Sequence, residues 1–264
     1  MTTKLVATDL DGTLVRTDGT VSPRTHDVLR RLAATGMPIV GVTGRGPRLI
    51  DLCRLDIPSA SFLALAQGGH VIDTGSGAWL SEITVDGTVF AKAVDLIEAE
   101  AGELHCTVEA DTAPESPLWG DPGPSWPYPG TWKPMARQAA LSGPILKVFL
   151  RAQGLSPDEL LAVARRVVPV TLCEVTEAGT GFIELTPPGV TKAAGLAVIA
   201  SALGVKPSEV LAFGDAPNDG PLLAWAGRAV AVANAHPEVM ALADDVTHSN
   251  DADGVASYLE QRFL

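Results

Sequence analysis

The stretch Lys4-Leu5-Val6-Ala7-Thr8-Asp9-Leu10-Asp11-Gly12-Thr13 decides the fold class, because an apolar run there meets a polar turn. Residues 4–8 predict a short strand buried in a parallel sheet, which the Asp-Gly turn ends. Ligands of open α/β sheets bind beyond the carboxyl ends of such strands, so Asp9 and Asp11 are expected to face a crevice. Two carboxylates one residue apart can serve as nucleophile and proton carrier around a hard cation. An ordinary polar strand end is the alternative at this point.

The chain continues outward from this strand as alternating helices and strands. Ser22-Pro23 predicts the start of a helix that ends at Gly36. Buried strands are expected at 38–42 and 62–66, and the same pattern returns late in the chain with a helix over 192–203, strands over 210–213, 228–232 and 245–247, and a helix over 253–263. These segments predict an α/β fold, a Rossmann-like parallel sheet core with helices on both faces.

The middle of the chain, residues 81–187, has a different pattern and predicts an inserted α+β domain, with the core formed by 1–80 and 188–264. Helices are expected over 88–101 and 156–168, and strands over 104–110, 145–150, 170–175 and 181–185. Residues 113–134 are rich in proline and tryptophan, which predicts an irregular loop.

Charge and cysteine content limit the partners and the compartment. A net charge of −12 and a pI near 4.8 argue against nucleic acid and anionic membranes as partners. The cysteines lie far apart without C-x-x-C spacing, which fits a reducing cytosol better than disulfides or zinc. The first residues lead directly into a strand, so we expect no secretion signal. The most apolar window, 195–205, is shorter than the roughly 20 residues of a membrane span. We therefore expect a cytoplasmic protein, monomer or homodimer.

Polar groups at distant points of the sequence suit attack on phosphorus by a carboxylate. Such a reaction needs the negative charge offset, the phosphoryl oxygens held and the leaving oxygen protonated. Thr43 and the Gly44 amide can donate to phosphate oxygens, and Lys192 brings a positive charge to a helix start. Asp215 and Asp219 offer the oxygen ligands that Mg²⁺ prefers.

Two further groups of residues have open interpretations. Arg45, Lys147 and Arg151 can meet a second anionic group of a substrate, although Lys147 alternates with apolar residues on its strand and can equally lie on a solvated face. Four aromatic residues of the Pro/Trp-rich segment suit either the faces of sugars or packing of the segment onto its own domain, and packing is favoured: Trp119, Trp126, Tyr128 and Trp132.

At this point the chain resembles the haloacid dehalogenase-like superfamily of phosphatases, and within it the Cof-like, type IIB capped group. The four motifs of that superfamily occur in the right order. They are Asp9-Leu10-Asp11-Gly12-Thr13, Thr43-Gly44-Arg45, Lys192, and Gly214-Asp215-x-x-Asn218-Asp219. The insertion lies between the second and third motifs, which is the position of the type IIB cap.

The resemblance implies a role for each motif residue. Asp9 would form an aspartyl-phosphate, and Asp11 would protonate the leaving alcohol and later activate water. Thr43 and Lys192 would bind the transferring phosphoryl group. The implied Mg²⁺ ligands are Asp9, the Asp11 carbonyl, Asp215 and, directly or through water, Asp219, with Asn218 as an outer metal or phosphate contact.

The resemblance also implies a Mg²⁺-dependent phosphomonoesterase acting on a small phosphorylated metabolite, with a sugar phosphate favoured and the cap choosing the substrate. The alternatives are a phosphatase of a phosphorylated glycoside intermediate (disaccharide phosphate or mannosyl-phosphoglycerate type), a phosphosugar mutase, and a non-catalytic phosphate-binding regulator. One departure is Gln67-Gly68-Gly69, where many relatives carry Asn-Gly. This difference concerns specificity and leaves the chemistry unchanged.

Overall fold

The computed structural model describes residues 2–124, 126–128, 130–177 and 181–264. The chain divides into two compact units. Unit 1 comprises residues up to 45, 49–82 and 191–264, and unit 2 comprises 46–48 and 83–190. Each unit has its own cluster of buried apolar side chains, so each has a separate hydrophobic core.

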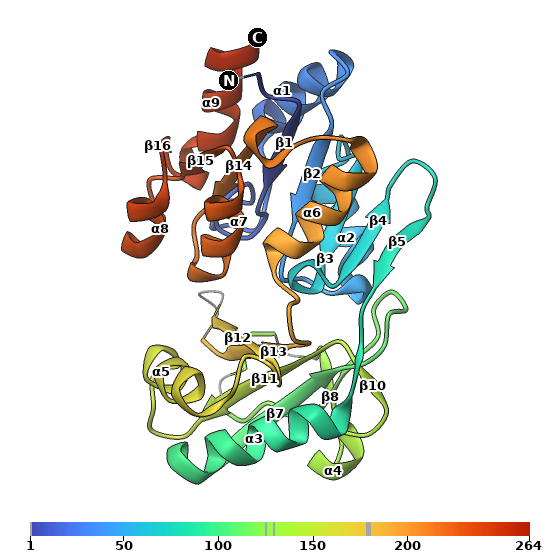
Figure 1. Cartoon of the computed structure of the whole chain (residues 1–264), viewed down its shortest axis with the longest axis vertical. Coiled ribbons are helices and arrows are strands. Elements are labelled where there is room, and N and C mark those ends of the chain that lie inside the picture. The colour runs from blue at the N-terminus through green and yellow to red at the C-terminus, as the bar shows by residue number, and fades with distance from the viewer. Residues whose placement is uncertain (1, 125, 129, 178–180) are drawn as a thin grey trace. The chain divides into compact units, whose positions relative to one another are not determined.

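Unit 1 is built on an eight-stranded sheet in the order β16-β15-β14-β1-β2-β3-β4-β5 (Figure 1). Six of the strands are parallel: β1 (Leu5–Thr8), β2 (Ile39–Val42), β3 (Phe62–Leu65), β14 (Val210–Gly214), β15 (Arg228–Ala231) and β16 (Asp245–Val246). The strand β4 (His70–Asp73) pairs antiparallel with β3, and β5 (Trp79–Glu82) pairs antiparallel with β4. The sheet is therefore mixed, but the strands predicted to carry the site end at one edge.

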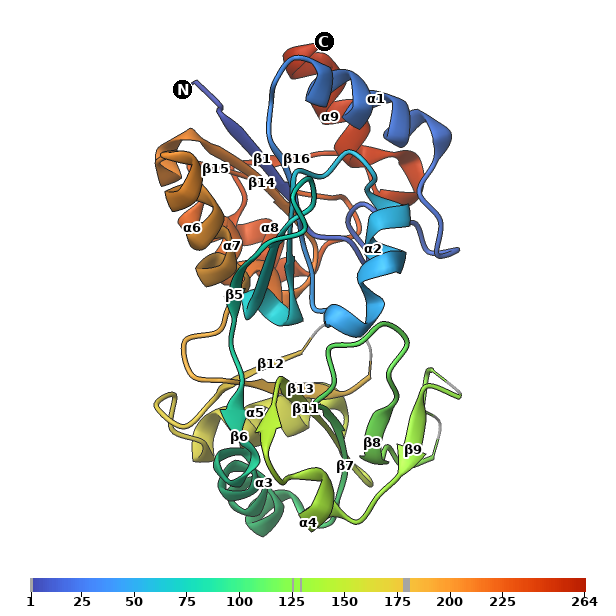
Figure 2. The same cartoon turned by 90° about the vertical axis from the view of Figure 1, so that its right-hand side faces the viewer.

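Helices cover both faces of this sheet (Figure 2), which confirms the expected α/β class. One face carries α1 (Pro23–Ala34), α2 (Ile50–Asp56) and α9 (Gly254–Phe263). The other face carries α6 (Lys192–Leu203) and α7 (Gly220–Trp225), with α8 (Pro237–Leu242) against α7. Short 3-10 turns join these elements at Pro47–Leu49, Ala66–Gly68, Pro207–Glu209, Pro217–Asp219 and Asn250–Ala252.

Local signals explain where the predicted helices of unit 1 begin and end. The Ser22 hydroxyl accepts from the backbone N–H of Thr25 at 3.0 Å and caps α1. Thr191 caps α6 in the same way through the N–H of Ala194. Gly204 ends α6 in the left-handed conformation, with φ +65°. Because Thr191 caps it, α6 begins at Lys192, as the sequence predicted.

Unit 2 contains a six-stranded sheet in the order β12-β13-β11-β7-β8-β9, antiparallel except for β8 and β9. Its strands are β7 (Leu104–Glu109), β8 (Leu118–Asp121), β9 (Trp132–Pro134), β11 (Lys147–Ala152), β12 (Glu174–Glu177) and β13 (Ile183–Thr186). A separate pair joins β6 (Val85–Asp86) to β10 (Pro144–Ile145). The helices α3 (Gly87–Ala101) and α5 (Pro157–Val167) pack on one face of the large sheet, and α4 (Arg137–Ala140) is a single turn. The two long helices were predicted from the sequence.

Two predictions in unit 2 are wrong. Residues 113–134, expected to be an irregular loop, contain β8 and β9, because the pairing of β8 with β7 and of β9 with β8 supplies order that the local sequence lacks. Residues 125 and 129 of that segment lie outside the described residues. The strand expected over 170–175 begins instead at Glu174. The turn before it is closed by the N–H of Leu172 donating to the Pro169 carbonyl, and it leaves Val170 exposed.

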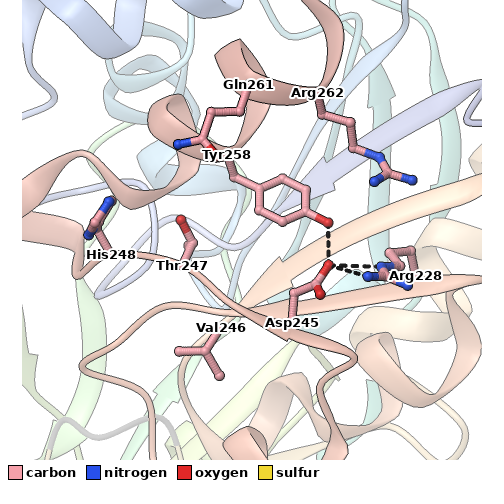
Figure 3. A pocket seen from close by; sticks show the side chains of 8 residues that line it. All are labelled: Arg228, Asp245, Val246, Thr247, His248, Tyr258, Gln261 and Arg262. Atoms are coloured by element: carbon pink, nitrogen blue, oxygen red, sulfur yellow. Dashed lines mark hydrogen bonds and ion pairs between the residues drawn. The ribbon is translucent and has the colours of Figure 1, made fainter.

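Unit 1 also contains a cavity of about 690 Å³ beside the edge strand β16 (Figure 3). Arg228 Nε and the Tyr258 hydroxyl donate to Asp245 Oδ2 at 2.9 and 2.5 Å on its wall. This ion pair ties β15, β16 and α9 together. In the described part of the chain, no helix combines the length and apolar character needed to cross a membrane.

Candidate active site

Asp9 and Lys192 form a buried ion pair in unit 1. Asp9 directly follows β1, and its N–H donates to the Phe213 carbonyl of β14. Lys192 Nζ donates to Asp9 Oδ1 at 2.7 Å and to Asp219 Oδ1 at 2.6 Å. All three side chains are almost completely buried. One ammonium group therefore lies between two carboxylates from distant parts of the chain.

Asp215 and Asp219 are held by the turn that follows β14. Asp219 Oδ2 accepts from the backbone N–H groups of Asp215 and Ala216, at 2.9 and 3.1 Å. Thr13 Oγ1 donates to Asp215 Oδ1 at 2.6 Å. Gly12 has φ +84°, and a Cβ at that position would lie 2.4 Å from Asp215 Oδ2. Thr13 thus holds Asp215 in place, and Gly12 leaves the space that the Asp215 carboxylate occupies.

Three carboxylates of this cluster suit a divalent cation. Asp9, Asp215 and Asp219 each offer one oxygen, and these oxygens all lie within 4.8 Å of one another. The donor set consists of oxygen alone, which hard cations such as Mg²⁺ prefer. Three carboxylates against one ammonium group also leave negative charge that a bound cation would balance. The residues present therefore fit a magnesium ion.

The pKa values in the cluster show the same excess of negative charge. Burial, followed by the charge of Asp219, raises the pKa of Asp9 well above its ordinary value, against the opposing effect of Lys192. Burial and Asp219 also raise the pKa of Asp215 to about 6. Burial acts to lower the pKa of Lys192, but the charges of Asp219 and Asp9 outweigh it and the pKa is raised. A cation placed among the carboxylates would favour their ionised forms.

Arg45 contacts Asp11 instead of remaining available to an anion. Its Nε donates to Asp11 Oδ2 at 2.8 Å, and its Nη2 donates to Asp11 Oδ1 at 2.5 Å. Its Nη1 donates to Asp56 Oδ2 at 2.5 Å. Burial acts to lower the pKa of Arg45, but the hydrogen bonds and charge of Asp11 outweigh it and the pKa is raised. The guanidinium group therefore joins the predicted proton carrier to the end of α2.

The remaining motif residues of unit 1 lie in loops that follow strands. Thr43 directly follows β2, is fully buried and accepts the backbone N–H of Arg45 at Oγ1, 3.1 Å away; Gly44 lies between these two residues. Asn218 Nδ2 donates to Gln67 Oε1 at 3.3 Å, and Asn218 Oδ1 is buried with no hydrogen-bond partner among the described residues. The departure at Gln67 is thus in contact with the fourth motif.

Lys147 lies in unit 2, on the sheet face opposite α3 and α5, which we call the polar face. The register places Lys147 beside Glu109, and Phe149 beside Thr107 and Glu184. Lys147 Nζ lies 3.2 Å from Glu184 Oε1 and 3.7 Å from Glu109 Oε2, and all three side chains are buried. Burial raises the pKa of Glu109, with Lys147 acting against this effect. The positive charge of Lys147 is therefore already balanced by two carboxylates.

Aromatic side chains extend the polar face. Trp126 stacks on Phe182 with ring centroids 5.1 Å apart, and Phe149 meets Phe182 edge-on at the same separation. Trp132 packs against this cluster. Trp119 instead is partly buried and packs against the core of unit 2. These contacts favour the packing interpretation of the aromatic residues, and they leave an aromatic wall beside the buried charges.

The sequence interpretation missed two residues of the unit 1 site. Thr13 stands in the first motif, so its hydroxyl was a visible candidate. Nothing in the sequence pointed to Asp56. It is the last residue of α2, a helix that was not predicted, and it belongs to no recognised motif. Only the folded chain brings Asp56 to Arg45.

Comparisons with known proteins show the family of this chain. The family model of haloacid dehalogenase-like hydrolases matches residues 6–259. A phosphoglycolate phosphatase of Methanopyrus kandleri is 30% identical over 263 residues, which cover 98% of this chain and 97% of that protein. The 5-amino-6-(5-phospho-D-ribitylamino)uracil phosphatase YwtE of Bacillus subtilis is 25% identical over 285 residues, covering 98% and 97%.

Solved structures share the fold over nearly the whole chain. The subclass IIB sugar phosphatase BT4131 superposes with a TM-score of 0.81 at 22% identity and covers 98% of both chains. BT1666 from Bacteroides thetaiotaomicron, described as a phosphatase of the same superfamily, superposes with a TM-score of 0.80 at 22% identity and covers 98% of this chain and 95% of its own. Because the family model matches residues 6–259, which is nearly the whole sequence, the chain belongs to the haloacid dehalogenase-like hydrolase family.

Proposed function

We propose that this protein is a Mg²⁺-dependent phosphomonoesterase that forms an aspartyl-phosphate on Asp9. The observation that carries the proposal is the placement of Asp9 against Lys192, with Asp215 and Asp219 close enough to share one cation. A carboxylate that attacks a phosphorylated substrate needs positive charge beside it, which here would come from Lys192 and from a cation bound by the three carboxylates. The phosphatase names of full-length relatives support the same reaction.

In the first step, an Asp9 carboxylate oxygen forms a bond to phosphorus and the bond from phosphorus to the leaving oxygen breaks. The electron pair of that bond stays on the leaving oxygen, which takes a proton from Asp11. Lys192 stabilises the charge on the phosphoryl oxygens and on Asp9, and the Thr43 hydroxyl donates to one phosphoryl oxygen. Magnesium, when bound, supplies further positive charge to the same oxygens.

In the second step, water replaces the leaving alcohol. Asp11, now a carboxylate, removes a proton from that water as its oxygen forms a bond to phosphorus. The bond between phosphorus and Asp9 breaks, inorganic phosphate leaves, and Asp9 returns as a carboxylate. Asp11 thus gives up one proton in the first step and regains one in the second.

We further propose that the substrate is a sugar phosphate and that unit 2 chooses it. The polar face carries a buried group with unused hydrogen-bonding capacity, since Thr107 Oγ1 has no hydrogen-bond partner among the described residues. Glu109 Oε1 also makes no hydrogen bond there, although it forms an ion pair with Arg48 Nε at 3.6 Å. Sugar hydroxyls both donate and accept, so they suit such groups, and aromatic faces suit the apolar side of a sugar ring. Trp126 and Phe182 both contact the ring of Phe149, which is the register partner of Thr107.

The test is phosphate release from a panel of phosphorylated metabolites plus one activated aryl phosphate. Wild type and Asp9→Asn are compared with Mg²⁺ and with a chelator. We expect release that needs the metal and falls by at least about 10³-fold in the variant, because the nucleophile is gone. A surface variant, Asp27→Asn on α1, serves as the matched control for loss of one carboxylate.

Other outcomes point to the alternatives. Substantial turnover by Asp9→Asn would overturn the nucleophile assignment. Phosphate moved between positions of one sugar, without release, would identify a mutase. No reaction with any substrate, in folded protein that binds Mg²⁺, would favour a phosphate-binding regulator.

A further inference from the structure

Asp11 is held by both of its carboxylate oxygens. Arg45 donates to Oδ2 through Nε and to Oδ1 through Nη2, which is the two-point geometry of an arginine fork. The Asp11 side chain is about half exposed, whereas that of Arg45 is largely buried. The guanidinium group is therefore the fixed partner of the pair, and Asp11 is the partner that is free to turn.

Asp56 fixes the guanidinium group from its other side. Its Oδ2 accepts from Arg45 Nη1, and both side chains are largely buried. Asp56 is the last residue of α2, where the helix dipole disfavours negative charge. A buried carboxylate at that end requires a cationic partner, so Asp56 and Arg45 hold each other in place.

The proposed reaction requires Asp11 to change partners. A proton donor needs one oxygen that carries hydrogen and points at the leaving group, and both oxygens of Asp11 now accept from Arg45. When Asp11 turns away, Arg45 loses two hydrogen bonds and one counter-charge. Asp56 keeps the guanidinium group paired during that time, and the fork is in place when Asp11 returns as a carboxylate.

We propose that Asp56 and Arg45 are positioning residues for Asp11, forming a three-residue relay in which Asp56 anchors Arg45 and Arg45 aims the carboxylate of Asp11. This inference rests on the proposed phosphatase reaction. Arg45 thereby acts on the proton carrier and is not a ligand of the substrate. Weakening the anchor affects the steps that need Asp11 and spares the attack by Asp9.

The leaving group separates these effects. An alkyl phosphate needs protonation of its leaving oxygen, whereas 4-nitrophenyl phosphate does not. The value of kcat/KM reports steps up to the first phosphoryl transfer and excludes hydrolysis of the aspartyl-phosphate. For Asp56→Asn we expect kcat/KM to fall roughly tenfold or more for the alkyl phosphate, part of the 10²–10⁴-fold that a general acid supplies. For the aryl phosphate it changes less than about threefold, because that leaving group needs no acid.

Three further variants make the comparison specific. Asp51→Asn, an exposed carboxylate on the same helix, should leave both values unchanged. Asp56→Glu keeps the charge and should restore most of the alkyl value. Arg45→Lys keeps a partner for Asp56 but lacks the fork, so it should show the same selective loss even if Asp56→Asn does not fold.

Equal losses on the two substrates, in folded protein, would overturn the proposal, as would no loss on either. A second measurement does not depend on turnover. Asp11→Asn and Asp56→Asn, singly and together, should change the free energy of urea unfolding non-additively, because the two residues share Arg45. Additive changes would overturn the relay, whether or not the protein hydrolyses phosphate. If wild type is inactive on both substrates but the unfolding free energies of the variants are non-additive, the proposed phosphatase reaction would be wrong and the relay would stand.

Discussion

Gly12, the glycine of the first motif, leaves room for the Asp215 carboxylate. Gly12 is in the left-handed region and lies against Asp215, as described above. Any side chain there must push the Asp215 carboxylate away from the other two carboxylates or distort the turn. The small residue is therefore required by the carboxylate opposite it as well as by the backbone.

Gly12→Ala should weaken Mg²⁺ binding by about tenfold or more, because the added Cβ displaces Asp215 from the shared position. Gly19→Ala is the matched control, since Gly19 has φ +80° and no atom within 4 Å of its added Cβ. Calorimetric titration with Mg²⁺ measures both. Equal Mg²⁺ affinities in the two variants would mean that the added Cβ at position 12 does not displace Asp215.

The raised pKa of Asp215, about 6, predicts how pH affects metal binding. An acid whose pKa is higher in the folded state than in the unfolded state destabilises the fold once it ionises. Without metal, the free energy of unfolding therefore falls as the pH rises from about 4 through 6. A cation binds the ionised form, so the rise in melting temperature caused by Mg²⁺ should be small at pH 5 and reach a plateau above pH 6. A rise that is the same at pH 5 and pH 7 would contradict this prediction.

At the scale of elements, the polar face combines two kinds of surface on neighbouring strands. Strand alternation puts Phe149 on the same side as Lys147 and puts Val148 into the core. Segment 113–134 adds Trp126 and Trp132 to that side and Trp119 to the other. One segment thus contributes tryptophans to both faces of the sheet.

Trp126→Ala should lower kcat/KM for sugar phosphates by about tenfold and leave the small aryl phosphate nearly unchanged, because only the sugar needs the aromatic face. Trp119→Ala removes the same side chain from the core side of the sheet. This control variant should be less stable, but the ratio of its kcat/KM for sugar phosphates to its kcat/KM for the aryl phosphate should change little. Shortening segment 113–134 should act like Trp126→Ala, and equal losses on both substrates would make the segment structural.

The elements that could be predicted from sequence are those with strong local signals. Ser22, Thr191 and Gly204 mark helix ends, and β1 and β14 are continuous apolar runs. The helix α2 was missed because Leu49 provides no side-chain cap. The strands β8 and β9 were missed because their order comes from pairing with β7 and with each other. Motif residues could be placed at strand ends, but contacts such as that of Asp56 with Arg45 depend on tertiary structure.

At the scale of the whole molecule, the division into units has a consequence for folding. Unit 2 is one continuous stretch apart from residues 46–48, and it has its own buried cluster. Unit 1 is discontinuous and needs segments from both ends of the chain. The two units therefore differ in how much of the sequence must be present before folding.

A fragment spanning residues 83–190 should unfold in a single cooperative transition, because its core is complete in that stretch. Circular dichroism during urea unfolding measures this. Leu150→Ala in the fragment, at a fully buried position, should lower the free energy of unfolding by about 2–5 kcal/mol. A gradual change without a midpoint would show that unit 2 depends on unit 1.

The sequence separation of Asp9 and Lys192 also determines when their ion pair can form in the nascent chain. The two residues stand 183 positions apart, so a ribosome needs on the order of ten to forty seconds to make the second after the first. Throughout that interval β1 also lacks its neighbour β14, and Asp9 has neither its ammonium partner nor Asp219 nearby. All of unit 2 is translated in the meantime. A truncated product of interrupted synthesis would consequently carry Asp9, the proposed nucleophile, without the partners that the proposed attack on phosphate esters needs.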